Sequence, residues 1–362
     1  MKLADILDRF EKIAPLGLAL SWDNVGLLVG ERDATVNKAL VSLDFTPNTL
    51  SHAIESEADL ILTHHPIWLK GIKRLNDPLI LELIRHNIAL VSFHTNLDTA
   101  RYSVNHALAD VLKLKVADKL SSETGNQQYM VQVTVPIEQI DQVREAAFAA
   151  GGGIVGEFDR CCARLAFQGT FRPLEAASLI TGVRGIENHI RQEKLEIQTS
   201  SSALPAVLAA IRRVHPYEQP YITHFPVQDP DPALGLGLIC TMEQKLKLRE
   251  LAEYVRDRLG APQLRLWLGG HSETAIPERI AICGGSGGSL IPLAQNKADV
   301  FISGDFSYHS LLDSSLPLID AGHFHTERPV LDYLQKVLKS FGVESAILPD
   351  TEHEYNQRNR WI

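Results

Sequence analysis

The stretch Ala58-Asp59-Leu60-Ile61-Leu62-Thr63-His64-His65-Pro66 predicts the fold class of this chain. A short apolar run that ends in polar residues is typical of a buried strand in a parallel sheet. The two histidines follow directly where this strand ends. Open α/β folds place their chemistry at the carboxyl edge of the sheet, so we expect both imidazoles to lie at a functional edge.

The segments on either side of this strand alternate between strand and helix patterns. A strand over residues 38–44 precedes a helix that begins at Thr46-Pro47, a pair that suits a cap and a first helical position. Beyond the histidines, a helix over residues 78–86 leads to a strand over residues 88–93. This β-α-β-α-β order predicts a parallel sheet with helices on its faces.

The region near the C-terminus repeats this pattern. Residues 298–305 align with residues 58–65, and each segment follows a strand, a turn and a helix of similar length. Downstream, an apolar strand leads to His94-x-x-x-Asp98 in the first copy and to His323-x-x-x-Glu327 in the second. We therefore expect an α/β fold of two related halves, whose strand ends meet across a pseudo-twofold interface.

Six residues at these strand ends could bind metal ions: His64, His65, His94, Asp98, His323 and Glu327. Imidazoles and carboxylates together suit one or two divalent transition metals, and zinc, manganese, iron and nickel all accept them. Without metal, two desolvated carboxylates close together cost free energy unless they are paired or protonated. The sequence therefore predicts that the two halves pack around a metal cleft.

Two ions in this cleft would give it hydrolytic chemistry. Glu327 can bridge two cations, and a water shared between them would lose a proton near neutral pH. The resulting hydroxide is a nucleophile. The alternative for each single histidine is that it caps a strand or hydrogen-bonds a neighbour, and we expect that role for His325.

The middle of the chain differs in character from both halves. Residues 121–128 are polar and predict a linker, and the Pro/Asp-rich residues 228–232 predict a second boundary. We therefore expect three parts. Residues 1–122 form the first α/β half, residues 123–230 form an inserted domain, and residues 231–362 form the second half, which packs with the first.

The inserted segment has the pattern of a small α+β domain. Alternating strands over residues 129–135 and 162–170, with helices over residues 137–150 and 202–214, suggest a ferredoxin-like fold. The motif His215-Pro216-Tyr217-Glu218 follows the second helix. Its His and Glu could ligate a metal, but a rigid loop at a sheet edge is the favoured interpretation.

Two further segments allow both a structural and a functional interpretation. In Trp22-Asp23-Asn24, the polar pair could form a turn through side chain-to-backbone hydrogen bonds, or the Trp could line a pocket. The glycine-rich residues 284–289 follow a strand and could cradle an anion with backbone N–H groups. Because neither a Walker lysine nor a complete G-x-G-x-x-G context accompanies them, close packing of the loop is favoured.

Composition excludes several classes of protein. A chain of 362 residues with 45% hydrophobic and 22% charged residues is typical of a globular protein of two or three domains. Its net charge of −9, from 35 basic and 44 acidic residues, speaks against a general nucleic-acid footprint. The four cysteines contain no C-x-x-C pair, and the N-terminus lacks the apolar core of a signal peptide. No apolar run approaches the ~20 residues of a membrane span, so we expect a cytoplasmic protein.

Together these motifs resemble the NIF-three-like dinuclear metal-centre family, whose members are often named GTP cyclohydrolase 1 type 2 homologues. The resemblance covers essentially the whole chain and rests on residues 22–27, 63–66, 94–98, 303–305 and 322–327. It implies two divalent metal ions per subunit, held by His64, His65, Asp98, His323 and Glu327, with His94 close by. It also implies a toroidal homohexamer with the metal sites facing an internal cavity.

The resemblance extends to the insertion and has one local exception. The inserted domain is similar to that of the longer family members, which resembles small trimeric signalling and copper-tolerance folds. Where family members carry a Lys-Tyr-His segment, this chain has Ser307-Tyr308-His309, so the positive charge of the lysine is missing.

Two functions from different classes follow. The first is a metal-dependent hydrolase acting on a nucleotide-like substrate, a ring amide or a phosphoester, with a metal-bound hydroxide as nucleophile and His94 or His309 as proton shuttle. The second is a non-catalytic, metal-binding ring that regulates or organises partners, because no substrate-reading constellation is evident in the sequence. An open metal pair favours the first and a closed site the second. The family label by itself does not show that the chain acts on GTP.

Overall fold

The computed structural model describes residues 1–68, 75–122, 127–156, 158–177, 179, 181–227, 233–351 and 353–358. The chain divides into two compact units, one made of Met1–Gly125 with Pro232–Ile362 and the other of Asn126–Asp231. The expected linker lies partly, and the expected boundary at residues 228–232 wholly, outside the described residues. Within the described ranges, no helix combines the length and the apolar character that crossing a membrane requires.

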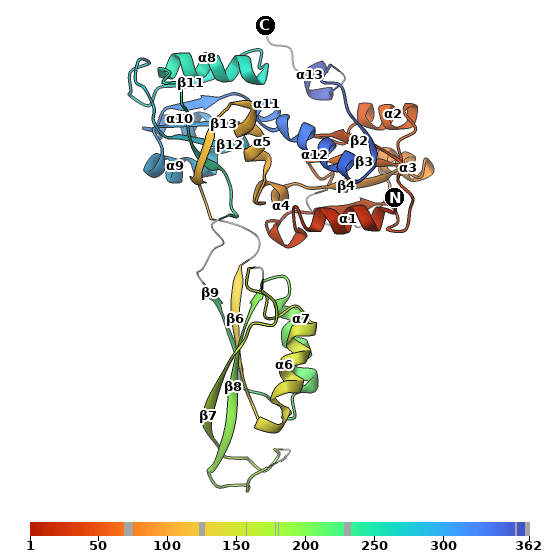
Figure 1. Cartoon of the computed structure of the whole chain (residues 1–362), viewed down its shortest axis with the longest axis vertical. Coiled ribbons are helices and arrows are strands. Elements are labelled where there is room, and N and C mark those ends of the chain that lie inside the picture. Colours follow the sequence, from red (N-terminus) through yellow and green to blue (C-terminus); the bar gives the residue numbers. More distant parts are fainter. Residues whose placement is uncertain are drawn as a thin grey trace. The chain divides into compact units, whose positions relative to one another are not determined.

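The first sheet of the larger unit has the strand order β1-β4-β3-β2-β15 (Figure 1). Its centre confirms the predicted parallel arrangement, with β2 (Lys38–Ser42), β3 (Leu60–Thr63) and β4 (Ala89–Ser92) running side by side. At one edge, β1 (Gly26–Val29) pairs antiparallel with β4. At the other edge, β15 (Glu344–Ile347) arrives from the end of the chain and runs parallel to β2.

The second sheet repeats this arrangement, with the order β11-β14-β13-β12-β10-β5. Its parallel centre consists of β12 (Ile280–Ser286), β13 (Val300–Gly304) and β14 (Leu318–Asp320), and β11 (Arg265–Trp267) pairs antiparallel with β14. Two antiparallel strands extend the other edge, β10 (Leu238–Thr241) and β5 (Lys115–Lys119). The fold is therefore α/β with two related halves.

The helices recur in the same order in the two halves. The first half contains α1 (Leu3–Glu11), α2 (Pro47–Glu55), α3 (Pro78–Arg85), α4 (Thr95–Asp98) and α5 (Val104–Val111). The second contains α8 (Leu248–Leu259), α9 (Ile291–Lys297), α10 (Tyr308–Leu312), α11 (His323–Glu327) and α12 (Pro329–Ser340), and α13 (Glu354–Arg358) follows β15. Local sequence explains several starts: Thr46 caps α2 through its side chain, as predicted, and Asp77 caps α3 in the same way.

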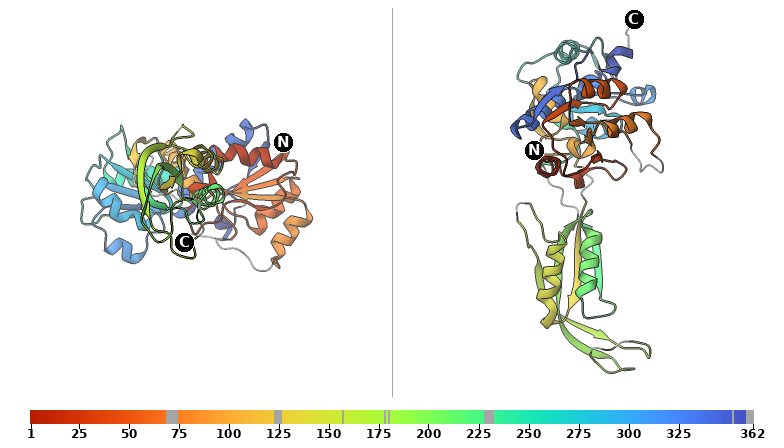
Figure 2. Two further views of the ribbon diagram at one scale, coloured as in Figure 1. Left: turned by 90° about the horizontal axis from the view of Figure 1, so that it is seen from below. Right: turned by 90° about the vertical axis from the view of Figure 1, so that its right-hand side faces the viewer.

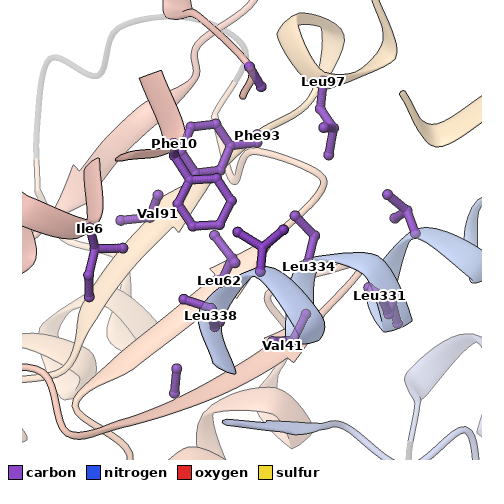
Figure 3. Close-up of a cluster of buried hydrophobic side chains, with 14 of the residues drawn as sticks. Ile6, Phe10, Val41, Leu62, Val91, Phe93, Leu97, Leu331, Leu334 and Leu338 are labelled. Atoms are coloured by element: carbon purple, nitrogen blue, oxygen red, sulfur yellow. The ribbon is translucent and has the colours of Figure 1, made fainter. Parts of the chain in front are cut away.

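The two halves exchange elements. The buried side chains of α12, among them Leu331, Leu334 and Leu338, pack against strands of the first sheet and against Phe10 of α1 (Figure 3). Conversely, Leu108 of α5 belongs to the core of the second sheet. The strand that follows each of these helices joins the sheet that the helix covers. β15 follows α12 and joins the first sheet, and β5 follows α5 and joins the second. The two sheets therefore do not coincide with the halves of the sequence.

The smaller unit has the element order β6-α6-β7-β8-α7-β9, which is the ferredoxin-like pattern. Its four strands pair antiparallel in the order β7-β8-β6-β9, with bounds β6 (Gln128–Val135), β7 (Ala163–Phe171), β8 (Asn188–Ser200) and β9 (Ile222–Val227). The helices α6 (Ile140–Ala149) and α7 (Leu204–Val214) lie on one face of this sheet (Figure 2). Val131, Val133 and Val135 alternate along β6 and pack against them.

Candidate metal centre

The predicted ligands lie where strands of both sheets end. His64 and His65 follow β3, and His94 follows β4 as the residue before α4. In the second half, His323 begins the short helix α11 after β14. The two carboxylates are the last residues of these short helices, Asp98 in α4 and Glu327 in α11. The strand ends of both halves therefore carry the predicted ligands.

These side chains come together around the carboxylate of Glu327. Its Oε2 lies 3.0 Å from Nε2 of His65 and 3.1 Å from Nε2 of His323, and its Oε1 lies 3.7 Å from Nε2 of His64. The same His64 nitrogen is 3.7 Å from Oδ1 of Asp98. One carboxylate from the second half thus faces two imidazoles from the first.

Two sets of donor atoms have the compactness of a metal site, with all atoms within 4.8 Å of one another. The first consists of His64, His65 and His94, and the second of His65, His323 and Glu327. His65 belongs to both sets. Because His94 is a member of the first, its imidazole lies inside the cluster rather than beside it.

All four imidazoles are oriented by an acceptor at Nδ1. The acceptors are the backbone oxygen of Phe93 for His64 (2.8 Å), Asp44 for His65 (2.7 Å), Asp23 for His94 (3.1 Å) and Asp305 for His323 (2.7 Å). An Nδ1–H that donates to a carbonyl or carboxylate leaves the lone pair on Nε2. Each ring therefore presents a ligand atom to the cluster, which is the orientation that metal-binding histidines adopt.

The three aspartates in this outer layer were not predicted as partners of the histidines. Asp44 follows β2 and Asp305 follows β13, so both stand at the same strand ends as the ligands. That position was the signal that could have identified them. Asp305 also takes the position that the internal repeat aligns with His65, and its backbone has a positive φ of 57°.

Asp23 combines the two interpretations of the Trp22-Asp23-Asn24 motif. It accepts hydrogen bonds from the backbone and side chain of Thr95 and from the backbone of Asn24, which is turn chemistry. Burial raises the pKa of Asp23, but His94 and Thr95 outweigh it and lower the pKa to about 2. Trp22 is half exposed, and its ring contacts the ring of His94 edge-on. The motif therefore orients the His94 ring through Asp23 and contacts it through Trp22.

The electrostatics of the cluster indicate a site built for cations. Burial lowers the pKa of His65 and His323, but Glu327 and the outer aspartates outweigh it and raise these values to about 10 and about 9. Burial also raises the pKa of Glu327, yet its histidine neighbours hold it well below the usual range. In the metal-free protein, protons on the imidazoles thus balance the buried carboxylate. Divalent ions would supply the same positive charge.

Among the buried side-chain atoms of the described residues that lack a hydrogen-bond partner, two belong to this cluster, Nε2 of His64 and Oε2 of Glu327. The Glu327 oxygen is close to two imidazoles, but none of the N–H groups is aligned with it. An unpaired buried polar atom costs free energy. Metal coordination would satisfy both atoms, so the residues present fit divalent metal binding.

The glycines at the end of β12 pack against this cluster. A Cβ atom at Gly285 would overlap Oε1 of Glu327, and one at Gly284 would lie 3.4 Å from the Cγ of the same residue. On the neighbouring strand, a Cβ at Gly304 would lie 2.6 Å from the backbone nitrogen of His323. The structure therefore supports close packing as the reason for these glycines.

Three other histidines of the sequence analysis lie apart from both ligand sets. His309 is exposed on α10, and its ring contacts Tyr308. His325 is buried against Phe324 and Tyr355, as a structural residue would be. His215 has both ring nitrogens engaged, with the backbone of Thr134 and of Tyr217, which agrees with a rigid loop.

A cavity of about 310 Å³ borders the cluster at His65. Its lining includes Asp44, Phe45, Ile67 and Trp68. Asn24 donates a hydrogen bond of 3.0 Å to the backbone oxygen of Trp68, so the motif that borders His94 also fixes one wall of the cavity. A small molecule in this cavity would lie next to His65, a candidate metal ligand.

Comparisons with known proteins cover nearly all of this chain. The model of the family described as Duf34/NIF3 (NGG1p interacting factor 3) matches residues 1–352. A protein of Halalkalibacterium halodurans named "GTP cyclohydrolase 1 type 2 homolog" is 32% identical over 370 residues, which is 98% of each chain. A Bacillus subtilis protein of the same name is 32% identical over 88% of this chain and 87% of its own length.

Solved structures of similar proteins match the fold of this chain over nearly its whole length. A Bacillus cereus protein related to NIF3 is 27% identical and superimposes with a TM-score of 0.63 over 96% of both chains. A Staphylococcus aureus protein is also 27% identical, with a TM-score of 0.71 over 100% of this chain and 99% of its own.

Proposed function

Because this chain belongs to the Duf34/NIF3 family, we propose that it is a dinuclear metal-binding protein that acts as a metal-dependent hydrolase. The observation that carries the proposal is the convergence of oriented imidazoles from both halves on Glu327. The substrate class is a nucleotide-like molecule, a ring amide or a phosphoester.

Two divalent ions per subunit would be held by His64, His65, Asp98, His323 and Glu327. Donor atoms that each lie about 2.0–2.2 Å from one ion are roughly 3–4 Å apart. The distances of 3.0–3.7 Å around Glu327 are in this range. Because its two oxygens face different imidazoles, Glu327 could bridge the pair. Zinc, manganese, iron and nickel all suit these donors.

The bound ions would lower the pKa of a coordinated water and so supply a nucleophile at neutral pH. The residues of the chain supply the rest. Asp23 holds Nδ1 of His94, and this imidazole remains partly accessible at 17% side-chain exposure, so it could carry a proton to or from the leaving group. His309 is a second proposed proton carrier, because α10 begins just after β13 at the same sheet edge.

The cavity beside His65 is the proposed substrate site. A volume of about 310 Å³ lies at the lower end of the range for small-molecule sites. Phe45 and Trp68 offer apolar surface for a ring, while the metal centre would face the bond to be cleaved. Asn24 keeps the Trp68 backbone in place.

A turnover screen of the metal-loaded, full-length protein tests this proposal. The panel contains GTP, other nucleotides, cyclic amides and phosphodiesters, each assayed with zinc, manganese, iron or nickel. We expect hydrolysis of one class, lost in Glu327→Ala and in the chelated protein, with a reduced kcat in His94→Ala. Absence of turnover across the panel by protein of verified metal content would overturn the hydrolase assignment.

A second candidate function is a non-catalytic, metal-binding ring that organises partners. It is favoured by one observation: α4 and α11, which carry Asp98 and Glu327, lead directly into the exchanged helices α5 and α12. Metal bound by Asp98 and Glu327 would stabilise the contact between the two halves where α5 and α12 are exchanged. With either function, we propose that the protein is cytoplasmic and forms a toroidal homohexamer. Sedimentation velocity measures the oligomeric state and so tests the hexamer. If chelation abolished only this assembly, and no substrate were turned over, the second function would hold.

A further inference from the structure

The end of the chain returns to the metal centre. β15 runs parallel to β2, so both strands finish at the same sheet edge, and the backbone N–H of Leu348 donates to the oxygen of Val41. Residues 349–351 and 353–358, which we name the C-terminal strap, then fold back on this edge. Within it, the side chain of His353 is buried, with 3% of its surface exposed.

His353 faces the carboxylate that orients a predicted metal ligand. Its Nε2 lies 3.2 Å from Oδ2 of Asp44, although the ring N–H is not aligned with that oxygen. The other oxygen of Asp44 accepts the Nδ1–H of His65 at 2.7 Å. Because the backbone N–H of Tyr355 donates to Nδ1 of His353, the proton of the neutral ring is on Nε2, toward Asp44.

The strap also contacts the helix that carries the ligands of the second half. The ring of His353 lies 4.6 Å from that of Phe324 in α11, and the Tyr355 ring stacks on Phe324 at 5.1 Å. Asp350 forms an ion pair of 3.1 Å with Arg328, the residue after α11. His323 and Glu327 lie in this same helix. The strap therefore touches ligand-bearing segments of both halves.

We propose that the C-terminal strap is part of the metal centre and that His353 is a positioning residue, which acts through Asp44 on His65. The inference rests on the proposed metal centre. A carboxylate that fixes a ligand histidine sets the orientation and basicity of the ring, and losing such a partner costs about 10–100-fold in metal affinity. Nε2 of His353 lies 3.2 Å from the second oxygen of that carboxylate, so its loss should have an effect at the lower end of this range.

Cobalt(II) binding by the full chain tests this inference without an activity assay. His353→Phe keeps an aromatic ring against Phe324 but removes the donor, and we expect about a tenfold loss of affinity and an altered visible spectrum of the bound cobalt. His353→Gln restores a donor and should recover most of the affinity. Glu354→Gln is the matched control, because it breaks the pair with Arg358 inside the strap, which reaches neither Asp44 nor α11, and it should bind like the wild type.

A double substitution distinguishes action through Asp44 from a general loss of stability. In Asp44→Asn, adding His353→Phe should cause little further loss of affinity, whereas additive losses would overturn the inference. Wild-type affinity in His353→Phe, or an equal loss in Glu354→Gln, would overturn it as well. Wild-type protein that binds no cobalt would overturn the proposed metal centre together with this inference, whereas the other outcomes leave the metal centre intact.

Discussion

Gly285 lies so close to Glu327 that a Cβ atom at this position would overlap Oε1 of the carboxylate and lie 3.2 Å from Nε2 of His323. The backbone of Gly285 also has a positive φ of 68°, which side chains other than glycine rarely adopt. The end of β12 is therefore a wall of the candidate metal centre, and the missing side chain of Gly285 makes room for the residue proposed to bridge the metal ions.

Gly285→Ala should reduce metal binding sharply. The new methyl group displaces Glu327, and the positive φ adds about 1 kcal/mol of strain. Gly260→Ala is a matched control, because Gly260 also has a positive φ, of 61°, and no atom lies within 4 Å of its Cβ position. Both variants should lose thermal stability, but only Gly285→Ala should lose metal, as measured by mass spectrometry of the purified protein. Similar metal content in the two variants would contradict the packing argument.

Glu327→Ala should lose more metal than His94→Ala. Glu327 faces imidazoles from both halves, so its removal takes a ligand from each ion, whereas His94 is proposed as a proton carrier. We expect less than one ion per subunit in Glu327→Ala and nearly the wild-type content in His94→Ala. Equal retention in the two variants would exclude the bridging role of Glu327.

Chelation should destabilise the protein, because ligands that bind only the folded state stabilise it by mass action. At a free metal concentration 1,000 times the dissociation constant, the stabilisation is about 4 kcal/mol. Differential scanning calorimetry of the chelated protein with and without added zinc measures this difference. His65→Ala, which removes a ligand shared by both donor sets, should show much less stabilisation by zinc.

The metal-free protein should lose stability as the pH rises from 6.5 to 10. His65 and His323 have pKa values of about 10 and about 9 in the folded state, against 6.5 as the ordinary value. Between these limits the folded state binds more protons than the unfolded state, so their contribution is complete below pH 6.5 and is lost as the pH passes through 9–10. Urea unfolding of chelated protein at pH 6.5, 8 and 10 measures this trend.

His65→Gln provides the control for that measurement, because it removes one of the titrating groups and should flatten the pH dependence. Metal affinity should change in the opposite direction and rise with pH, since bound ions replace these protons. A chelated wild type as stable at pH 10 as at pH 6.5 would show that the two imidazoles are not held in the charged form.

The sequence was sufficient to predict the α/β halves and to collect the candidate ligands. Both predictions rest on local signals: apolar runs give strands, and polar residues after parallel strands lie at one edge of the sheet. Because His94-x-x-x-Asp98 recurs as His323-x-x-x-Glu327, the sequence also predicted that the ligand-bearing edges of two sheets are related by an internal repeat. The structure brings these side chains together around Glu327.

Contacts between distant segments could not be read from the same signals. Asp44 and His353 meet because β15 pairs with β2, and an apolar run predicts a strand without specifying its neighbour. In the same way, the apolar stripe of α5 predicts that the helix is covered but not which sheet covers it. The exchange of α5 and α12 was therefore missed, and with it the positioning role of the strap.

The exchange of α5 and α12 also determines when the chain can finish folding. During synthesis, the first sheet emerges long before α12 and β15, which supply one of its packing layers and one of its edges. The apolar face that receives Leu331 and Leu334 must stay uncovered until α12 has left the ribosome. The first half is thus a nascent intermediate in need of protection from aggregation, and the candidate metal centre is completed last.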